Sequence, residues 1–396
     1  MKIIERKDYL DTMIKVIKPI DIKVITGIRR SGKSKLLLLF KKYLEGKKYN
    51  VIFIDFNNSD FDDLKNAKKL ESFIESKYKE NKENFVLVDE VQLCEGFEKA
   101  IISLHVKEKY HIYITGSNAF LLSSDLATLF TGRAFEIEVY PFSFKEYLQY
   151  FKHNDIDEAF DKYVFEGGFS GSYLYEDLQN KYSYINKEIL ETIIVKDICK
   201  KYKIKNIQII KSLCSYMLDN ASNLTSANSI TNYLSSHKNK VTNKTISNYI
   251  DYLCKSFLFY KIDKYDIKGK KYLNQTHKFY LCDHSLKYAR LGTKNLDIGR
   301  TYENIVAIEL LRRKYDVYVG QLYNGEIDFV ASKQNEKIYI QVCKSLDDTK
   351  TLEREVKPLL SIKDAYPKII ITRSKLQEYS YEGIKIIDIT DWLINY

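Results

Sequence analysis

Residues 27–34 read Gly-Ile-Arg-Arg-Ser-Gly-Lys-Ser, which is a complete G-x-x-x-x-G-K-[ST] phosphate-binding loop. This loop constrains the fold because it works only between a buried strand and the first turn of a helix. Both flanks have the required pattern, since the apolar run 22–26 predicts a strand and the stretch 33–40 predicts a helix. A chance match in a lysine-rich chain is the alternative, and the two flanks argue against it. The octet therefore predicts an α/β unit that binds a nucleotide.

The chemistry of such a loop gives each fixed residue a part. Gly27 and Gly32 permit the tight turn that points backbone N–H groups at a phosphate, where the helix N-terminus adds partial positive charge. Lys33 is expected to reach the β- and γ-phosphates, and the Ser34 hydroxyl is expected to ligate Mg2+. ATP and Mg2+ are thus the expected ligands. The residues expected to line the nucleotide are Gly27, Arg29, Arg30, Ser31, Gly32, Lys33 and Ser34.

A second motif is an apolar run that ends in two acids. Residues 85–88 read Phe-Val-Leu-Val, the pattern of a buried strand, and Asp89 and Glu90 follow at its carboxyl end. This is the Walker B pattern, in which Asp89 would join the Mg2+ shell and Glu90 would orient and deprotonate the attacking water. Two acids that cap the next helix are the alternative. Beside a phosphate-binding loop, the Walker B interpretation is favoured and predicts ATP hydrolysis.

Five apolar runs alternate with helical stretches in the N-terminal third of the chain. They predict strands over residues 22–26, 51–56, 85–89, 112–115 and 135–139. Strands that alternate with helices are typical of βαβ units, which build parallel sheets. The predicted fold class of this part is therefore α/β, with a P-loop NTPase core.

Two weaker site predictions belong to the same core. Ser117 or Asn118, just beyond the strand 112–115, could sense the γ-phosphate and position water, although an ordinary turn would have the same composition. Arg133 precedes the last predicted strand and could neutralise γ-phosphate charge, either in its own subunit or in a neighbouring one. A salt-bridged surface arginine is the alternative for Arg133.

Composition narrows the class of protein. A length of 396 residues suggests two to four domains, and a net charge of +10, from 63 basic and 53 acidic residues, permits a nucleic-acid partner without requiring one. The six cysteines have no C-x-x-C spacing, so neither a zinc site nor a disulfide framework is expected. Because no apolar run approaches the roughly 18 residues of a membrane span, we expect a soluble cytoplasmic protein without membrane contact.

The middle of the chain predicts a helical connector and then a winged helix. Residues 150–220 have apolar side chains at helical spacing, whereas 226–234 and 242–253 read as two short helices joined by a polar turn. An apolar run, 257–262, and a basic hairpin, 268–271, follow as a predicted wing. Bound to DNA, such a domain would use Lys244, Thr245, Asn248 and Tyr249 in the groove and Lys268, Lys270 and Lys271 on phosphates. Packing or protein docking is the alternative role.

The C-terminal segment has the order of acidic residues that is typical of a restriction-endonuclease-like core. Glu303 lies in a helical run, Glu326 and Asp328 begin a strand, and Gln341 and Lys344 lie at the end of the next strand. In such a core, carboxylates hold Mg2+ and a lysine activates water. Here the amide of Gln341 is a poorer ligand than a carboxylate, and Cys343 stands at the expected lysine position. The pattern favours a vestigial module that binds DNA or protein, while an active nuclease and a purely structural core stay as alternatives.

These motifs together resemble those of the prokaryotic AAA-type ATP-binding proteins. The resemblance includes Leu-Val-Asp-Glu-Val-Gln at 87–92, Ile-Thr-Gly-Ser-Asn at 114–118, Thr-Gly-Arg at 131–133 and Tyr-Pro-Phe-Ser-Phe-Lys-Glu-Tyr at 140–147. It implies an N-terminal ATPase of the additional-strand class, with strand 112–115 between the two Walker strands, and a nuclease-like C-terminal domain of unknown function. The expected organisation is an AAA-type P-loop domain over 1–149, a helical lid or connector over 150–220, a winged helix over 221–275 and an α/β restriction-endonuclease-like domain over 276–396.

Two functional classes follow from this organisation. The first is an ATP-hydrolysing switch whose nucleotide state controls how the winged helix and the C-terminal domain grip DNA. The second is an ATP-dependent switch for protein interaction, in which both appended domains dock partners. A metal-dependent nuclease under ATPase control is a third, weaker reading. The oligomeric state cannot be read from the sequence, although a trans-acting Arg133 would require a homo-oligomer.

Overall fold

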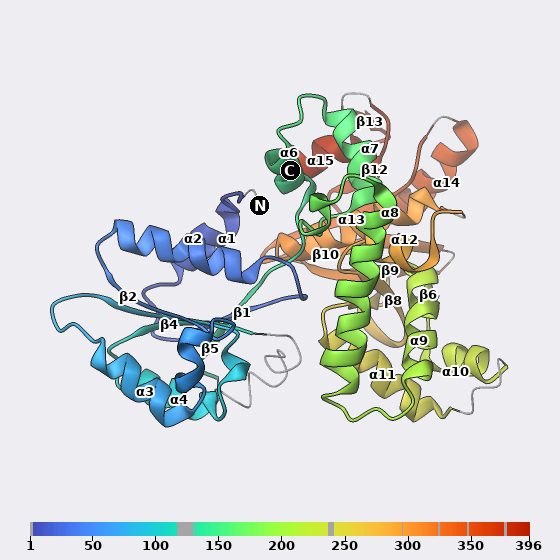
Figure 1. Ribbon diagram of the computed structural model, residues 1–396. Helices are drawn as coiled ribbons and strands as arrows, with labels where there is room; N and C mark the ends of the chain where they lie inside the picture. The colour runs from blue at the N-terminus through green and yellow to red at the C-terminus, as the bar shows by residue number, and fades with distance from the viewer. Residues whose placement is uncertain are drawn as a thin grey trace. The chain divides into compact units, whose positions relative to one another are not determined.

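The computed structural model describes residues 3–116, 130, 132–236, 241–294, 296–323, 325–346, 348–375 and 378–396, with the backbone alone for 272–275. These residues form two compact units (Figure 1). The first unit comprises the described residues of 1–141 together with 196–202 and 255–257. The second unit comprises those of 142–195, 203–254 and 258–396.

The first unit is built on a parallel sheet. Its strands are β1 (Ile22–Thr26), β2 (Asn50–Asp55), β3 (Asn84–Asp89), β4 (His111–Thr115) and β5 (Ala134–Glu138). Their order is β2-β3-β4-β1-β5, and every neighbouring pair is parallel. The prediction of a parallel α/β sheet is confirmed, and so is the expectation that strand β4 lies between the two Walker strands β1 and β3.

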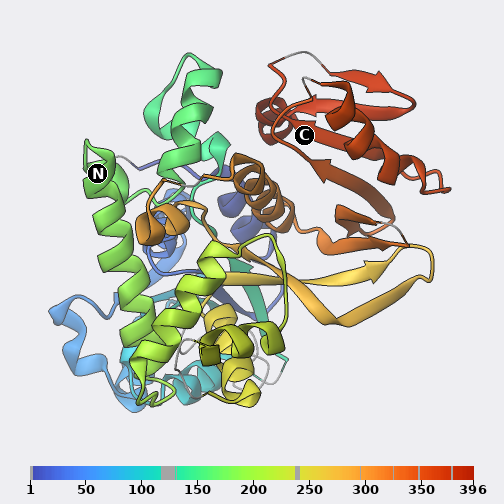
Figure 2. The same cartoon turned by 90° about the vertical axis from the view of Figure 1, so that its right-hand side faces the viewer.

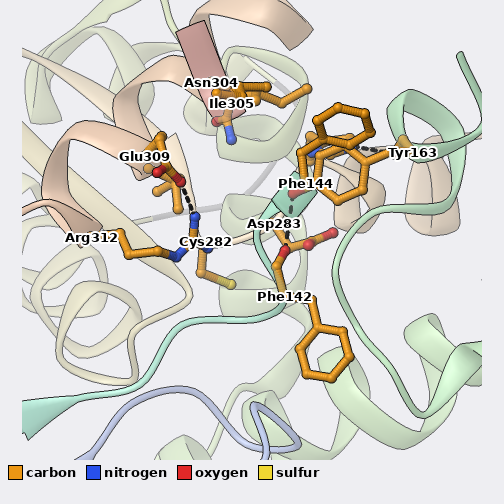
Figure 3. A pocket seen from close by; sticks show the side chains of 12 residues that line it. Phe142, Phe144, Tyr163, Cys282, Asp283, Asn304, Ile305, Glu309 and Arg312 are labelled. Atoms are coloured by element: carbon orange, nitrogen blue, oxygen red, sulfur yellow. Dashed lines mark hydrogen bonds and ion pairs between the residues drawn. The ribbon is translucent and has the colours of Figure 1, made fainter. Parts of the chain in front are cut away.

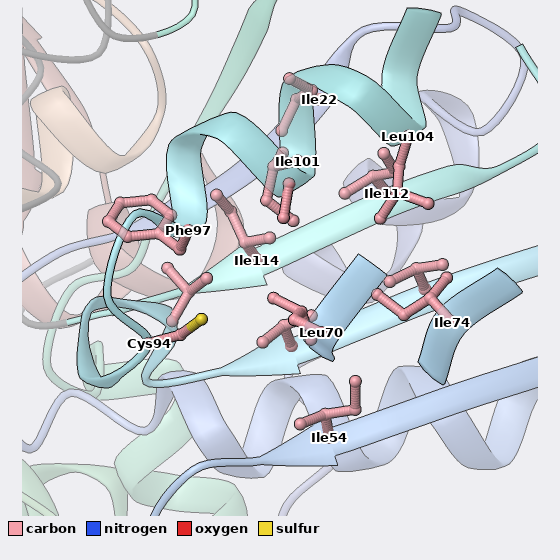
Figure 4. Packing of buried hydrophobic residues seen from close by; sticks show 14 of the residues in the cluster. Ile22, Ile54, Leu70, Ile74, Cys94, Phe97, Ile101, Leu104, Ile112 and Ile114 are labelled. Atoms are coloured by element: carbon pink, nitrogen blue, oxygen red, sulfur yellow. The ribbon is translucent and has the colours of Figure 1, made fainter. Parts of the chain in front are cut away.

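Helices cover both faces of this sheet, which explains why its strands read as continuous apolar runs. Helices α1 (Lys7–Lys15) and α2 (Lys33–Gly46) lie on one face, and α3 (Ala67–Ser76) and α4 (Phe97–Val106) lie on the other (Figure 1). Alternate residues of a strand point to opposite faces. In β3, for example, Val86 and Val88 pack toward α3 and α4, as in the cluster of Figure 4, whereas Phe85 and Leu87 pack toward α1 and α2.

Short helical turns complete the first unit, and mostly helical segments begin the second. The turns are the 3-10 segments η1 (Ser59–Leu64) and η2 (Val91–Leu93). The segments that follow are α6 (Phe144–Phe151), α7 (Ile156–Glu166), η3 (Ser172–Leu174), α8 (Leu178–Tyr184), the π-helical η4 (Ile185–Glu191) and η5 (Ile193–Cys199), and α9 (Ile207–Asp219). The helical periodicity that the sequence shows over 150–220 thus corresponds to real helices, joined by short loops.

The second unit contains one nine-stranded sheet of order β13-β14-β12-β11-β10-β9-β7-β8-β6. The strands are β6 (Leu224–Thr225), β7 (Phe259–Asp266), β8 (Lys271–Leu281), β9 (Asp316–Leu322), β10 (Gly325–Lys333), β11 (Glu336–Val342), β12 (Lys368–Thr372), β13 (Tyr379–Tyr381) and β14 (Ile384–Asp388). Its helices beyond α9 are α10 (Ala227–Ser236), α11 (Asn243–Lys255), α12 (Ser285–Leu291), α13 (Ile298–Arg312), α14 (Thr349–Leu360) and α15 (Ile389–Asn395).

This sheet joins two segments that the sequence treats as separate domains. Strand β7 pairs antiparallel with β8 and parallel with β9, with Lys264 opposite Val319 (Figure 2). The predicted boundary between residues 275 and 276 therefore falls inside β8. The predicted wing also has one edge covered by β9, a pairing across more than fifty residues that local sequence windows cannot reveal.

The interior of the second unit is closely packed around the end of β8. Figure 3 shows a cavity of about 10 Å³ there, between the aromatic rings of Phe142, Phe144 and Tyr163 and the polar side chains of Asp283 and Asn304. That volume is roughly one water-sized probe position. The cavity is therefore a packing gap and not a ligand site.

In the parts of the chain that the structure describes, no helix combines the length and the apolar character that crossing a bilayer requires. All six cysteines are free thiols, and five of them are buried.

Candidate functional site

The phosphate-binding loop owes its shape to two glycines with left-handed backbone. Gly27 has φ +122°, and a Cβ built there would lie 2.1 Å from the carbonyl oxygen of Val139. Gly32 has φ +96° and caps the N-terminus of α2. Any side chain at Gly27 would push the loop away from the end of β5, so the sequence pattern there has a steric cause.

Lys33 is buried in the hollow of this loop. Its ammonium donates hydrogen bonds to the carbonyl oxygens of Gly27 at 2.9 Å and Ile28 at 3.0 Å. Burial lowers the pKa of Lys33 to about 8, although the charges of Glu90 and Asp89 act in the opposite direction. Within the described structure the buried hydroxyl of Ser31 has no hydrogen-bond partner. A buried cation on neutral partners and an unsatisfied hydroxyl suit an anion such as a phosphate.

Ser34 and Asp89, the two predicted Mg2+ ligands, are in contact. Asp89 lies at the carboxyl end of β3, only 2% exposed, and its carboxylate accepts hydrogen bonds from the side chains of Thr115 and Ser34. Burial raises the pKa of Asp89 and outweighs the two hydrogen bonds, which lower it. A hydroxyl beside a carboxylate is an oxygen pair of the kind that Mg2+ uses in P-loop proteins, so these residues fit the predicted metal.

Glu90 follows Asp89 directly and is half-buried. Its backbone is left-handed, with φ 53°, and its carboxylate accepts a hydrogen bond from the side chain of Gln92. Its backbone N–H lies 3.4 Å from the hydroxyl oxygen of Thr115. The Thr115 hydroxyl thus contacts both Walker B acids, and sequence reasoning missed this residue one strand away, although its place at the tip of β4 was a usable signal.

Two further residues hold the loop in place, and the sequence pointed to neither. Arg6, almost fully buried, donates to the carbonyl oxygens of Ser31 at 2.7 Å and Tyr140 at 2.9 Å. Asp197, from the segment 196–202 of the first unit, accepts two hydrogen bonds from Arg29, at 2.6 and 3.0 Å. The bond to Asp197 raises the pKa of Arg29. Arg29, predicted as a nucleotide contact, is therefore held by a carboxylate, while Arg30 is exposed with φ 68°.

The remaining predictions for this core have different outcomes. Ser117 and Asn118 lie outside the described residues. Arg133 is exposed and precedes β5, whose first residue, Ala134, lies opposite Ile22 at the start of β1. The loop begins at the other end of β1, and five strand residues span about 16 Å. Action of Arg133 on the phosphate site of its own subunit is therefore wrong on geometric grounds, and only the trans alternative stays open.

The predicted acids of the C-terminal segment gather around one lysine. The ammonium of Lys278, on β8, lies 2.7 Å from a carboxylate oxygen of Glu326, 2.9 Å from Glu303 and 3.5 Å from Asp328. Burial alone would lower the pKa of Lys278, but the three carboxylates raise it. Burial also raises the pKa of Asp328, and the nearby charge of Glu303 adds to that effect.

The structure connects this lysine cluster to the other predicted residues through hydrogen bonds. Gln341 accepts from the backbone N–H of Asp328 at 3.3 Å and donates to Glu355 of α14 at 2.9 Å. A cavity of about 650 Å³ opens beside these groups, and both Cys343 and Lys344 line it. The expectation that Cys343 and Lys344 face opposite sides is wrong, because β11 ends at Val342 and strand alternation stops there.

A divalent cation does not fit this cluster as it stands. The ammonium of Lys278 lies among the carboxylates, and the described residues include no group of three His, Cys, Asp or Glu side chains placed to hold a metal ion. Two like-signed cations cannot share one site of this size.

The residues predicted to face DNA lie on the surface of the second unit. Lys244 and Asn248 of α11 are exposed, and Thr245 and Tyr249 of the same helix are half-buried. At the turn between β7 and β8, the exposed basic residues are Lys268, Lys270 and Lys271.

Two family models match the chain. The model of an AAA domain matches residues 20–148, and a domain of unknown function, DUF8612, matches residues 157–297. The second match spans both the helical connector and the α10–β8 region, which the sequence had divided at residue 220. Residues 20–148 are therefore an AAA domain of the P-loop type.

Two curated relatives extend over nearly the whole chain. An uncharacterized protein of Haemophilus influenzae is 38% identical over 99% of this chain and 98% of its own length. An uncharacterized protein of Methanocaldococcus jannaschii is 31% identical over 96% of this chain and 87% of its own length. Among solved structures, the Walker-type ATPase PABY2304 of Pyrococcus abyssi matches 73% of this chain and 96% of its own at 16% identity, with a TM-score of 0.44. A TM-score below 0.5 does not establish a common arrangement of the whole chain. The identities to the two relatives do establish common descent, and the chain belongs to the same family as these Haemophilus and Methanocaldococcus proteins, with an AAA domain at its N-terminal end.

Proposed function

We propose that this protein is a Mg2+-dependent ATPase that uses its nucleotide state as a switch. The observation that carries the proposal is the contact between Ser34 and Asp89 at the mouth of a loop that buries the Lys33 ammonium. Lys33 would bind the β- and γ-phosphates of ATP in exchange for the two loop carbonyls. Ser34 and Asp89 would hold Mg2+, which supplies neutralisation of phosphate charge.

Glu90 is the proposed general base for hydrolysis. It follows the Mg2+ ligand Asp89 directly, it is half-buried, and its backbone N–H and carboxylate are both engaged by neighbours. A carboxylate held in this way can orient a water molecule and accept its proton.

The decisive experiment compares wild type with Glu90→Gln. The variant should bind ATP with unchanged affinity, while hydrolysis falls by about 10²- to 10⁴-fold. Binding is measured by fluorescence of a labelled ATP analogue, and hydrolysis by phosphate release. Wild-type turnover in the variant would remove Glu90 from the mechanism, and a wild-type protein that does not bind ATP would overturn the whole proposal.

We further propose that the second unit acts on DNA. The order α9, β6, α10, α11, β7, β8, with β8 between β6 and β7 in the sheet, supports a winged helix, and α11 presents Lys244 and Asn248 to solvent. The net charge of +10 favours the same partner. Retention of DNA at low salt and stimulation of ATP hydrolysis by DNA would support this; absence of both would favour the alternative, a protein-interaction switch, to which the covered edge of β7 points.

The order α13, β9, β10, β11, α14, β12 supports a restriction-endonuclease-like fold for the C-terminal part, with β9, β10 and β11 antiparallel and β12 parallel to β11. We propose that this part does not cleave DNA, because Lys278 occupies the carboxylate cluster. Plasmid DNA should stay intact with the purified protein and Mg2+ or Mn2+, and cleavage would contradict the proposal.

Arg133 is the proposed link between neighbouring subunits. Since it cannot reach its own phosphate site, a role at the γ-phosphate requires a second copy of the chain. The molecular mass with and without ATP tests this, and a monomer under both conditions excludes a trans role.

A further inference from the structure

We propose that the Lys278 ammonium is a built-in cation that fills the position of a divalent metal in the C-terminal carboxylate cluster, and that its removal would expose a metal-binding site. The proposal concerns the second unit alone and does not depend on ATP binding or hydrolysis.

The geometry around Lys278 is that of a coordinated cation. Its ammonium lies within 2.7 to 3.5 Å of carboxylate oxygens from Glu326, Glu303 and Asp328. An ammonium has three N–H donors and no acceptor, so three carboxylates can satisfy it fully. The lysine side chain is only 6% exposed, which leaves it little access to water.

The carboxylates are fixed by other contacts and do not owe their positions to Lys278 alone. The Tyr280 hydroxyl donates to Glu303 at 2.7 Å, and the backbone N–H of Val342 donates to Asp328 at 2.9 Å. Oxygen atoms that stay in place when the lysine is removed form a preorganised set of hard ligands, which is what Mg2+ or Mn2+ requires.

The charge balance of the cluster also favours a second positive charge. Three carboxylates face one ammonium, so the cluster is formally negative even with Lys278 present. The raised pKa of Asp328 agrees with this excess, because burial and the neighbouring Glu303 disfavour its ionised form. Once Lys278 is replaced by a neutral side chain, a divalent cation would neutralise the cluster better than a proton does.

The cation enters from a strand other than the one where the nuclease-like motif would place a lysine. Lys278 belongs to β8, where it lies opposite Leu224 of β6 and Ile262 of β7, whereas the motif position on β11 is followed by Cys343. A lysine that had moved to β8 to activate water for cleavage is the competing explanation. That explanation requires a metal beside Lys278 in the wild-type protein, and ours requires none.

The test is Mn2+ binding without nucleotide, measured from the loss of the free Mn2+ electron paramagnetic resonance signal. Lys278→Ala should bind one more Mn2+ per chain than wild type, at an affinity about tenfold or more above any wild-type binding, because ligand charge sets the affinity of such sites. Lys264→Ala is the matched control. Lys264 also reaches Glu326, at 4.0 Å, but its hydrogen-bond partner is Gln321 at 2.7 Å, so this variant loses the same charge outside the cluster and should behave as wild type.

Two further variants keep the outcome clear. Addition of Asp328→Asn to Lys278→Ala should abolish the gained site. If Lys278→Ala does not fold without metal, the charge-balanced pair Lys278→Met with Glu326→Gln retains Glu303 and Asp328 and should still gain Mn2+ binding. A folded variant that gains no Mn2+ would overturn the proposal, as would wild-type protein that binds Mn2+ through Asp328. Since both readouts lack ATP, either failure leaves the proposed ATPase untouched.

Discussion

The two units each bury a lysine beside acidic residues, and the two lysines have opposite properties. Lys33 donates to two carbonyl oxygens of its own loop, whereas Lys278 lies among three carboxylates. Burial acts in the same direction on both, but the pKa of Lys33 is lowered to about 8 while that of Lys278 is raised. A buried ammonium on neutral partners can be given a phosphate, and one that carboxylates already neutralise cannot.

The largest expected difference between the two lysines is in stability. Lys278→Met leaves Glu303, Glu326 and Asp328 without their cation, and breaking a buried ion pair in this way costs about 3–5 kcal/mol. Lys33→Met removes hydrogen bonds to neutral carbonyls and relieves a buried charge, so its cost should stay below about 1.5 kcal/mol. Hydrogen exchange of amides in β8 and β10 for the first variant, and in β1 and β3 for the second, measures each opening free energy.

Equal costs for the two substitutions would contradict the comparison. A small cost for Lys278→Met would mean that the carboxylates of the second unit take up protons or rearrange when the cation is lost. The wild-type protein at the same pH is the reference for both variants.

The next effect concerns ATP affinity, where the order of the two lysines reverses. Lys33→Ala should weaken ATP binding roughly 10- to 150-fold, since a hydrogen bond to a charged group contributes about 1.5–3 kcal/mol. Lys278→Ala, in the second unit, should leave ATP affinity unchanged. Titration with a fluorescent ATP analogue measures both; an equal loss in the two variants would mean that unfolding, not a lost phosphate contact, causes the effect of Lys33→Ala.

The first site could be predicted from the sequence because its parts are local. The octet 27–34 specifies its own turn and helix start, and the acids after the 85–88 run end a strand that parallel pairing brings to the same sheet edge. The residues that support this site are distant. Arg6 contacts Ser31 across 25 positions and Asp197 contacts Arg29 across 168, and neither contact has a sequence signature.

For the second site the sequence predicts the acids correctly and misses the cation. The predicted acids Glu303, Glu326 and Asp328 do come together, but Lys278 lies in a strand of unremarkable alternation, 25 positions from Glu303 and 50 from Asp328. Only the pairing of β7 with both β8 and β9 brings β8 into the sheet of the acids. A motif shows which ligands are present; tertiary structure determines what already neutralises them.

A smaller effect is expected at Thr115, which positions the Walker B acids of the first site. Thr115→Val removes the hydroxyl that donates to Asp89 and lies against the Glu90 backbone. Loss of such an outer contact to a metal ligand typically costs about 10- to 100-fold in metal affinity or activity. ATP hydrolysis should fall in that range and require more Mg2+, and Thr115→Ser should restore both. A fall in hydrolysis with unchanged Mg2+ dependence would assign Thr115 to folding alone.

The smallest effect is the pH dependence of stability, and here the two lysines differ in sign. The pKa of Lys33 is about 8 in the folded protein and 10.5 in the unfolded chain, so between these values the unfolded chain binds the extra proton. Folded-state stability then rises with pH, by at most about 1.4 kcal/mol per pH unit for one group. The pKa of Lys278 is raised above 10.5, so its contribution is fully present below that pH and is lost only as pH rises through the folded value.

Comparison of wild type with Lys33→Met isolates the first of these effects. Lys23, whose pKa burial also lowers to about 8, is present in both proteins and cancels. Between about pH 8 and pH 10.5 the wild type should gain stability relative to the variant, as measured by urea unfolding of the first unit. A constant difference over this range would mean that Lys33 keeps its proton in the loop, and the contrast with Lys278 would then rest on hydrogen-bond partners alone.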